Sequence, residues 1–323
     1  MKIHYDIENL PKFRNAVVTI GTFDGVHLGH QKIIDQLKTE AAAINGETAI
    51  ITFHPHPRKI VSSTFLGIRL INTLDEKIEL LEQAGIDHLV VVPFTEAFAN
   101  QPAEDYVRNF LVSKFHPHTI IIGYDHRFGK ERKGDYLLLE KMADECNYIL
   151  KEIPKQMLDE ISISSTKIRE ALVEGRIEVA DKLLGYDFFF SGTVIDGDKL
   201  GRKLGYPTAN LKIQDEEKII PGNGIYAVYV EIGVRESNVR SQASDVILQT
   251  SFLKGMMSIG FRPTVGGSKR VVEVNIFDFD EEIYGQTLKV FVKKYLREEI
   301  KFNSLEDLVK QIDQDKVDSL KVL

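Results

Sequence analysis

Two histidines and three glycines occupy a short stretch where an apolar run gives way to a helical pattern. The run Ala16–Ile20 is rich in β-branched residues, as buried strands are, and apolar residues after it recur at helical spacing. Between the two lie Gly21, Gly25 and Gly29 with His27 and His30. A strand, a glycine turn and a helix start together offer backbone N–H groups and a positive helix end to an anion. These residue types predict a nucleoside triphosphate that is held by its phosphates.

Two further segments of the first half could converge with this turn, since each follows a predicted strand or opens a predicted helix. An apolar strand over Thr119–Ile122 precedes Asp125 and Phe128, and the hydroxyl-rich run Ser164–Thr166 precedes Arg169. A transfer reaction at a triphosphate needs positive charge and N–H donors, because negative charge spreads onto the leaving phosphate groups. We expect the two histidines and the arginine to supply this charge. A phosphate nucleophile needs no general base, so positioning and electrostatics would carry that reaction.

A second glycine-rich run, Gly192–Leu211, lies in the other half of the chain and could lay backbone against a phosphate chain. Within it Thr208 and Asn210 stand two residues apart, so on an extended segment their oxygens point the same way and suit a hard cation such as Mg²⁺. Strand alternation over Val271–Phe277 places Glu273 on one face. A simple glycine hairpin and a solvent-facing glutamate are the alternative interpretations of these two segments.

The same residues resemble known family signatures over almost the whole chain, from Val18 to about Asp315. Gly21–His30 looks like the signature of HxGH nucleotidyltransferases, in particular the adenylyltransferase module of prokaryotic bifunctional FAD synthetases, and Ile163–Arg169 resembles the second element of that family. The Gly192–Leu211 run with its Pro207–Asn210 tetrapeptide resembles the riboflavin kinase module. The resemblance implies an α/β doubly wound nucleotidyltransferase domain followed by a small antiparallel β-barrel domain with a C-terminal helix. It implies an enzyme that makes FMN from riboflavin and ATP, and then FAD and pyrophosphate from FMN and ATP.

Site residues follow from the motifs and from this resemblance. The predicted catalytic residues are His27, His30, Arg169 and Glu273, the last as the general base toward the ribityl hydroxyl. The predicted ATP-binding residues are Gly21, Phe23, Asp24, Gly29, Ser164, Ser165, Thr166, Gly197, Gly201, Lys203 and Gly205. The predicted flavin-binding residues are Asp125, Phe128 and Arg297, and the predicted ligands of a Mg²⁺ ion bound with ATP are Thr208 and Asn210. One departure is His126, where the family commonly carries phenylalanine.

Composition limits the class of protein. The chain has 323 residues, 43% of them hydrophobic and 28% charged, with a net charge of −7 and one cysteine. This acidic balance argues against a nucleic-acid partner, which needs a basic surface. No apolar run is long enough to cross a membrane, and a single cysteine fits a reducing cytoplasm. Neither a P-loop nor a GxGxxG fingerprint occurs. The expected partners are the small molecules riboflavin, FMN and ATP, and the expected location is the cytoplasm.

The elements that must position these residues divide the chain near Tyr186, into an adenylyltransferase domain over 1–185 and a kinase domain over 186–323. Strands alternate with helices in the first half, which predicts a parallel sheet with its ligand at the carboxyl ends of the strands. That half is expected to end in one helix that runs from the Ser164 region to about Leu184. Short strands follow, among them Met257–Ile259, and the polar stretch Glu231–Leu253 is expected to be a loop. A charged amphipathic helix over Leu305–Leu320 ends the chain.

Two other functions remain open on the sequence. One is an adenylyltransferase for a different phosphate acceptor, with the barrel as a binding module. The other is a non-catalytic flavin-binding or regulatory protein.

Overall fold

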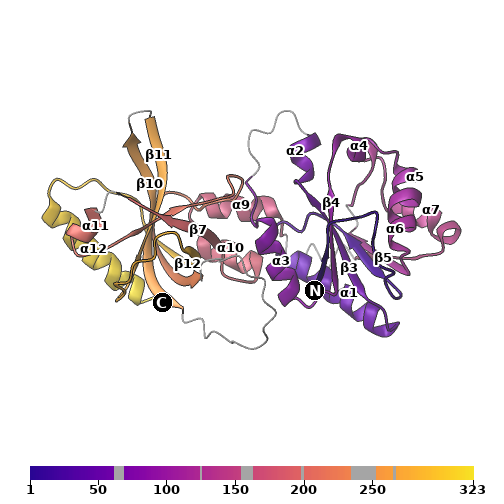
Figure 1. Ribbon diagram of the computed structural model, residues 1–323, viewed down its shortest axis with the longest axis horizontal. Coiled ribbons are helices and arrows are strands. Elements are labelled where there is room, and N and C mark those ends of the chain that lie inside the picture. The colour runs from indigo at the N-terminus through magenta and orange to yellow at the C-terminus, as the bar shows by residue number, and fades with distance from the viewer. Residues whose placement is uncertain (62–68, 124–125, 154–162, 198–199, 234–251, 265–266) are drawn as a thin grey trace. The chain divides into compact units, whose positions relative to one another are not determined.

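The computed structural model describes residues 1–61, 69–123, 126–153, 163–197, 200–233, 252–264 and 267–323. These residues form two compact units, Met1–Ser165 and Thr166–Leu323 (Figure 1). The expected boundary at Tyr186 differs from this division by a pair of helices, and the place of the domain boundary stays a proposal.

The first unit is built on a parallel sheet of six strands. In sheet order they are β1 (Lys2–His4), β4 (His88–Pro93), β3 (Thr48–His54), β2 (Val17–Ile20), β5 (Thr119–Gly123) and β6 (Ile149–Ile153). Every neighbouring pair is parallel. Strand β1 was not predicted, because three residues are too few for a pattern.

Alternate residues of the central strands enter two cores, one on each face of the sheet. Val17 and Ile50 pack with helix α1 (Leu28–Ala43) and helix α3 (Leu74–Gln83). Their neighbours Val18 and Ile51 pack on the other face, with the π-helical segment η1 (Tyr106–Val112) and helix α7 (Tyr136–Cys146). Burial of both faces is what a near-continuous apolar strand requires. The predicted doubly wound α/β architecture is therefore confirmed (Figure 1).

Short helical segments complete this unit. They are α2 (Pro57–Val61), α4 (Glu96–Ala99), α5 (Ala103–Asp105), α6 (Ser113–Phe115) and η2 (Lys130–Arg132). A capping box of Thr73 and Glu76 starts α3, with both reciprocal hydrogen bonds formed.

The sheet has its topological switch at β2, since the chain passes from β2 to β3 on one side and reaches β5 on the other. Ligands of open α/β sheets bind at the carboxyl ends of strands next to such a switch. The glycine-histidine turn follows the carboxyl end of β2 directly.

The second unit begins with two helices, where the sequence pattern had indicated one. Helix α9 (Ser165–Val173) starts at the last residue of the first unit, and helix α10 (Ile177–Leu184) follows. The break lies at Gly175, whose φ is +72°. A Cβ there would lie 3.0 Å from the ring of Tyr295, so this glycine also allows a close approach to the barrel. The prediction of a single helix was wrong, because the break depends on that contact.

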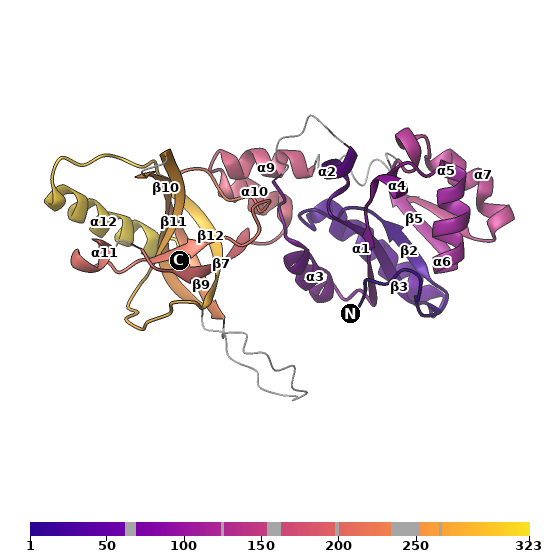
Figure 2. The ribbon, with the colours of Figure 1, turned by 45° about the horizontal axis from the view of Figure 1, so that its top comes forward.

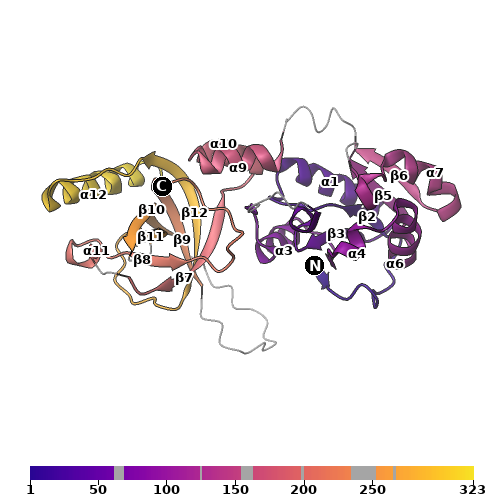
Figure 3. The same cartoon turned by 90° about the horizontal axis from the view of Figure 1, so that it is seen from above.

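Six strands then close into an antiparallel barrel (Figure 2). Their order is β10 (Leu253–Thr264), β11 (Gly267–Ile276), β8 (Ala209–Lys212), β7 (Phe189–Ile195), β12 (Thr287–Arg297) and β9 (Gly224–Gly233). Helix α11 (Leu200–Lys203) lies between β7 and β8, and helix α12 (Leu305–Leu320) ends the chain as predicted. Helix α12 contacts β9, β10 and β12 and lies along one side of the barrel (Figure 3).

Strand β10 is much longer than the predicted Met257–Ile259. It pairs with β11 from Gly255 to Thr264 and with β9 from Leu253 to Ile259. The strand contains glycine and proline, which have low β-propensity, so propensity alone does not predict it. It forms because β9 and β11 pair with it on either side. The loop predicted over Glu231–Leu253 is wrong at its ends, because β9 reaches Gly233 and β10 starts at Leu253; its remainder lies outside the described residues, apart from Phe252.

Candidate functional site

The turn after β2 presents the histidine pair at the start of α1. His27 is the N-cap of α1, and its Nδ1 accepts the N–H of His30 at 3.4 Å. The two rings stack with their centroids 3.8 Å apart. A Cβ at Gly29 would lie 3.1 Å from His27 Nδ1, so the glycine lets this ring lie over the first helical turn. The predicted convergence of an imidazole pair with a helix N-terminus is present.

His30 is held in its neutral form. Burial is the main reason that its pKa lies well below the ordinary 6.5, and the nearby His27 and Lys77 lower it further. The expectation that His30 supplies positive charge is therefore wrong for this environment. Its buried Nδ1 has no hydrogen-bond partner among the described residues. A buried ring nitrogen of this kind is suited to a hydrogen bond with a ligand.

The backbone between β2 and α1 is strained. Phe23 has a φ of +48° and Val26 a φ of +36°, and a β-branched residue rarely adopts this left-handed region. The ring of Phe23 is buried and lies against His30, 4.8 Å between centroids, so the predicted contact of Phe23 with ATP would use its backbone. Gly21 donates its N–H to Ile51 O at 3.0 Å. Strain of this kind collects at functional sites and persists only where surrounding contacts enforce it.

Asp24 makes some of the hydrogen bonds that stabilise this strained turn. Its buried carboxylate accepts the backbone N–H groups of Ile71 at 2.9 Å and Asn72 at 3.3 Å. Its carbonyl oxygen accepts the hydroxyl of Ser165 at 2.9 Å. Asp24 thus joins the turn to the segment before α3 and to Ser165, the last residue of the first unit. This is a structural role that the sequence did not indicate, and the predicted contact with ATP stays a prediction.

The other predicted residues of this site are only partly placed. Phe128 is buried against Tyr106, with 4.9 Å between ring centroids, so its ring packs in the core and a flavin contact stays a prediction. Asp125 lies outside the described residues. Thr166 and Arg169 belong to α9 in the second unit, and their contribution beside the histidines also stays a prediction, as does that of Ser164.

In the barrel, a cavity of about 330 Å³ gathers several predicted residues. It is lined by Gly201, Thr208, Glu273 and Arg297, together with apolar residues from α12. Glu273 lies on β11 with Asn275 on the same face, whereas Val274 is buried on the other, as the alternation predicted. The carboxylate of Glu273 pairs with the guanidinium of Arg262 at 2.5 Å.

The glycine-rich run packs as closely as its composition suggests. A Cβ at Gly197 would lie 2.1 Å from Asn210 Nδ2, and one at Gly201 would lie 2.3 Å from Tyr206 O. Gly205 has a φ of +83°. A side chain at Gly197 or Gly201 would displace a neighbour, whereas one at Gly205 would meet open space but strain the backbone. The side chain of Lys203, a predicted ATP ligand, lies outside the described part of the chain.

A second cavity of about 320 Å³ adjoins the first at Thr208, which lines both. Val274 and Ile276, from the opposite face of β11, line it, as do Arg202 and Asp280. The Pro207–Thr208 segment is fixed by Asn275, whose Nδ2 donates to Pro207 O at 2.7 Å. Thr208 therefore stands where a group could pass between two adjoining spaces.

Arg297 anchors the C-terminal helix. Its Nε and Nη2 donate to the two carboxylate oxygens of Asp315 at 2.8 and 2.6 Å. Asp315 is buried on α12 and also accepts Gln311 Nε2 at 2.9 Å. Arg297 is followed by two glutamates in sequence, yet its carboxylate partner is an aspartate eighteen residues away. The predicted flavin contact of Arg297 stays a prediction.

Sequence reasoning missed several residues of both sites. They are Lys77 in the first unit and Arg262, Asn275 and Asp315 around the barrel cavity. Asp315 had a weak signal, since it falls on the apolar stripe of α12, and Asn275 had one through its alternation with Glu273. Lys77 had none, because only the tertiary structure shows that it is buried.

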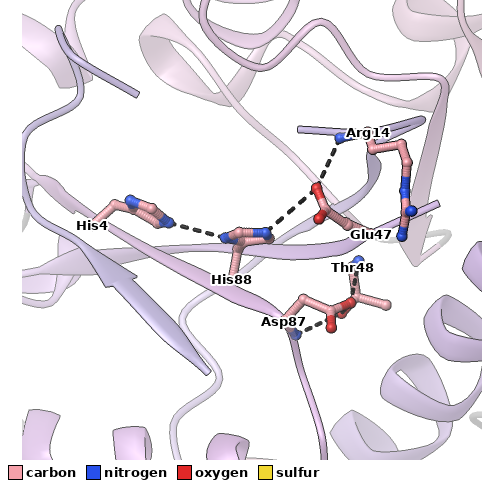
Figure 4. Close-up of polar contacts among 6 residues, drawn as sticks. All are labelled: His4, Arg14, Glu47, Thr48, Asp87 and His88. Atoms are coloured by element: carbon pink, nitrogen blue, oxygen red, sulfur yellow. Dashed lines mark hydrogen bonds and ion pairs between the residues drawn. The ribbon is translucent and has the colours of Figure 1, made fainter. Parts of the chain in front are cut away.

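A different histidine cluster lies at the amino ends of β3 and β4 (Figure 4). His4 Nε2 and His88 Nδ1 are 3.0 Å apart, and His88 Nε2 lies 3.6 Å from the carboxylate of Glu47. Burial is the main reason that the pKa of each histidine is lowered. This cluster lies at the edge of the sheet away from the glycine-histidine turn and joins the ends of three strands.

A parallel α/β unit with stacked histidines at a helix N-terminus, joined to a barrel with a carboxylate in its cavity, defines a two-site nucleotide-dependent transferase. Comparison with known proteins gives the family. Residues 10–167 match the FAD synthetase family model, and residues 184–323 match that of riboflavin kinase. The chain belongs to the family of bifunctional riboflavin kinases/FMN adenylyltransferases.

Relatives of that name align over nearly the whole chain. The one from Listeria monocytogenes is 37% identical over 94% of this chain and 91% of its own length. The one from Escherichia coli is 34% identical over 98% and 96%. A solved structure titled as a macrolide-efflux protein from Streptococcus pneumoniae is 28% identical, with a TM-score of 0.83 over 98% of this chain and 97% of that one. Among the described residues, no helix has the length and apolar character to span a membrane.

Proposed function

We propose that the two transfer reactions of this family are carried by the two sites described above. The barrel phosphorylates riboflavin with ATP to give FMN, and the parallel-sheet unit joins FMN to the AMP moiety of a second ATP, with release of pyrophosphate. Riboflavin, FMN and ATP are the small-molecule substrates, and the cytoplasm is the proposed location.

In the kinase reaction, the ribityl 5′-hydroxyl attacks the γ-phosphorus of ATP and ADP leaves. The hydroxyl must lose its proton, and Glu273 accepts it. The ion pair with Arg262 orients this carboxylate. We assign the alcohol to the cavity that Glu273 lines and the triphosphate to the adjoining one, because Thr208 borders both.

Thr208 and Asn210 fit a Mg²⁺ ion by their chemistry, since a hydroxyl and an amide oxygen are hard donors. Asn210 lies against Gly197, where the missing Cβ leaves its side chain room, and opposite Glu273 in the strand register. When bound, the ion would neutralise charge on the phosphate oxygens. The protein residues hold the segment in place: Asn275 fixes Pro207, and the glycines give the chain its close turn.

In the adenylyl transfer, a phosphate oxygen of FMN attacks the α-phosphorus of ATP. His27 and His30 lie at the N-terminus of α1, where N–H groups and the helix dipole favour the leaving pyrophosphate. His30 acts as a neutral N–H donor. The nucleophile is already charged, so no carboxylate base is needed.

The main support for this assignment is that a carboxylate lines the cavity of the barrel, whereas the carboxylate near the histidines is hydrogen-bonded to backbone N–H groups. Asp24, next to the histidines in sequence, has its carboxylate engaged by the backbone of Ile71 and Asn72. Glu273 instead lines a cavity. Only phosphorylation of an alcohol needs a base, and the available carboxylate lies in the barrel.

The test supplies riboflavin and FMN to the enzyme separately with MgATP. Glu273→Gln should lower FMN formation from riboflavin about 100-fold or more and leave FAD formation from FMN unchanged. His27→Ala with His30→Ala should do the reverse. Glu299→Gln is the matched control, since Glu299 lines the same cavity with a carboxylate whose pKa is raised by burial. Parallel loss of both activities in either variant, or loss of the kinase through Glu299 alone, would contradict the assignment.

A further inference from the structure

Lys77 is a lysine in the interior of the first unit, on the first turns of α3. Its side chain and backbone together are only 7% exposed. Lysine is almost never this buried without an anionic partner. Within the described residues, the one hydrogen bond from Lys77 Nζ is long, 3.4 Å to Thr52 Oγ1. An ammonium group has three donors, so the site leaves this group poorly satisfied. Burial of a poorly hydrogen-bonded ammonium group costs stability, and such costs are typical of functional sites.

The contacts of Lys77 lead directly to the strained turn. Thr52 Oγ1 accepts the hydrogen bond from Lys77 Nζ, and it donates to Thr22 O at 3.2 Å. Thr22 precedes Phe23, where the backbone first enters the left-handed region. The segment just before α3 is tied to the same turn by Asp24 through Ile71 and Asn72. Lys77 and Asp24 thus hold the turn from the same neighbouring element.

The charges around Lys77 form a small set. The negative charge of Asp24 favours the protonated form of Lys77, and His27 and His30 belong to the same site. Glu76, its neighbour on α3, is turned to the N–H of Thr73 in the capping box. Since His30 is neutral, the buried ammonium of Lys77 is a positive charge of this site, and it lowers the pKa of His30.

We propose that Lys77 is a positioning residue of the adenylyl-transfer site, whose buried ammonium supplies positive potential there and keeps His30 in its neutral, donating form. The inference rests on the proposed function of the first unit. A positive charge in a dry site acts more strongly on developing negative charge than it would in water. It also opposes protonation of a neighbouring imidazole.

The pH profile of FAD formation tests this in the intact enzyme. Burial lowers the pKa of Lys77 to about 8, so kcat/KM for FAD formation from FMN should fall on the alkaline side above about pH 8. The kinase activity of the same chain should lack this limb. Lys77→Arg keeps a charge that does not titrate and should remove the limb. Lys77→Met should lower kcat about 10- to 100-fold and move the acid limb to higher pH, since His30 then protonates more easily.

Lys38→Met is the matched control, because Lys38 is exposed on α1 and donates to Ala84 O at 2.9 Å. It should leave both profiles unchanged. If Lys77→Met does not fold, the shift of the acid limb cannot be measured. The proposal is then tested by comparing the alkaline limb of the wild type with that of Lys77→Arg. An alkaline limb that is absent from the wild type, or that persists in Lys77→Arg, overturns the proposal. Absence of any FAD formation by the wild type instead removes the proposed function itself.

Discussion

Asp181 offers a stability test that is independent of catalysis. It lies on α10, and its Oδ1 accepts the N–H of Phe188 at 2.8 Å, where the chain enters the barrel. Burial is the main reason that the pKa of this carboxyl rises to about 7, and the charges of Asp187 and Glu178 raise it further. The hydrogen bond from Phe188 opposes the rise but does not cancel it. Asp181→Asn keeps the acceptor and removes the charge.

The magnitude follows from linkage. In the unfolded chain the carboxyl ionises near its ordinary value of 3.8, whereas in the folded protein it keeps its proton until about 7. The unfolded state therefore binds fewer protons between these values, and the free energy of unfolding falls as pH rises through them. Three pKa units correspond to about 4 kcal/mol, which is an upper bound. Above pH 7 this loss is complete, and below pH 4 it is absent.

Asp181→Asn should therefore be more stable than the wild type at pH 8, by up to about 4 kcal/mol, and similar to it near pH 4. The assay is urea unfolding by circular dichroism at several pH values, with the barrel transition located by loss of riboflavin phosphorylation. Asp278→Asn is the control, because Asp278 is 89% exposed and pairs with Lys316 on the surface; little change is expected there. A deficit of the Asp181 variant that is equal at all pH values would refute the reasoning.

Three further predictions concern other parts of the chain. The pKa of His88 is lowered in the folded protein, so below about pH 6.5 the unfolded state binds more protons and the free energy of unfolding falls as the pH falls. His88→Gln should make this fall smaller for the first unit, as measured by urea midpoints at several pH values. Gly197→Ala should slow riboflavin phosphorylation about 10- to 100-fold and spare FAD formation from FMN in initial-rate assays, since its Cβ would displace Asn210. Asp315→Asn should leave the half-buried Arg297 guanidinium without the anion that it holds, at a cost of about 2 kcal/mol, and should raise the KM for riboflavin and expose α12 to protease.

Local patterns carried much of the fold. The capping box at Thr73, the strand alternation around Glu273 and the turn at Gly29 each depend on residues a few positions apart, and all three are present in the structure. The order of elements then restricts the topology, because parallel strands joined by helices cover both faces of a sheet. The division into an α/β module and an all-β module could be predicted for this reason, whereas the barrel was implied by the resemblance to the riboflavin kinase module.

Other features could not be predicted, because they depend on contacts between distant residues. The break between α9 and α10 involves a ring 120 positions away in sequence, and β10 is long because its neighbours pair with it. Arg297 looked like a partner of adjacent glutamates and instead holds Asp315. Short-range propensity competes with such contacts and is overridden by them.

The amino-acid sequence by itself determined the residue types that the chemistry needs, their order and the turns that carry them, since these follow from local spacing and backbone freedom. The tertiary structure alone decided their ionisation and their partners. His30 is neutral, Asp24 is a structural acceptor and Lys77 is a buried cation, because burial withdraws the water that would otherwise stabilise each charge. Solvent exposure is a property of the packed chain, and no single segment contains it.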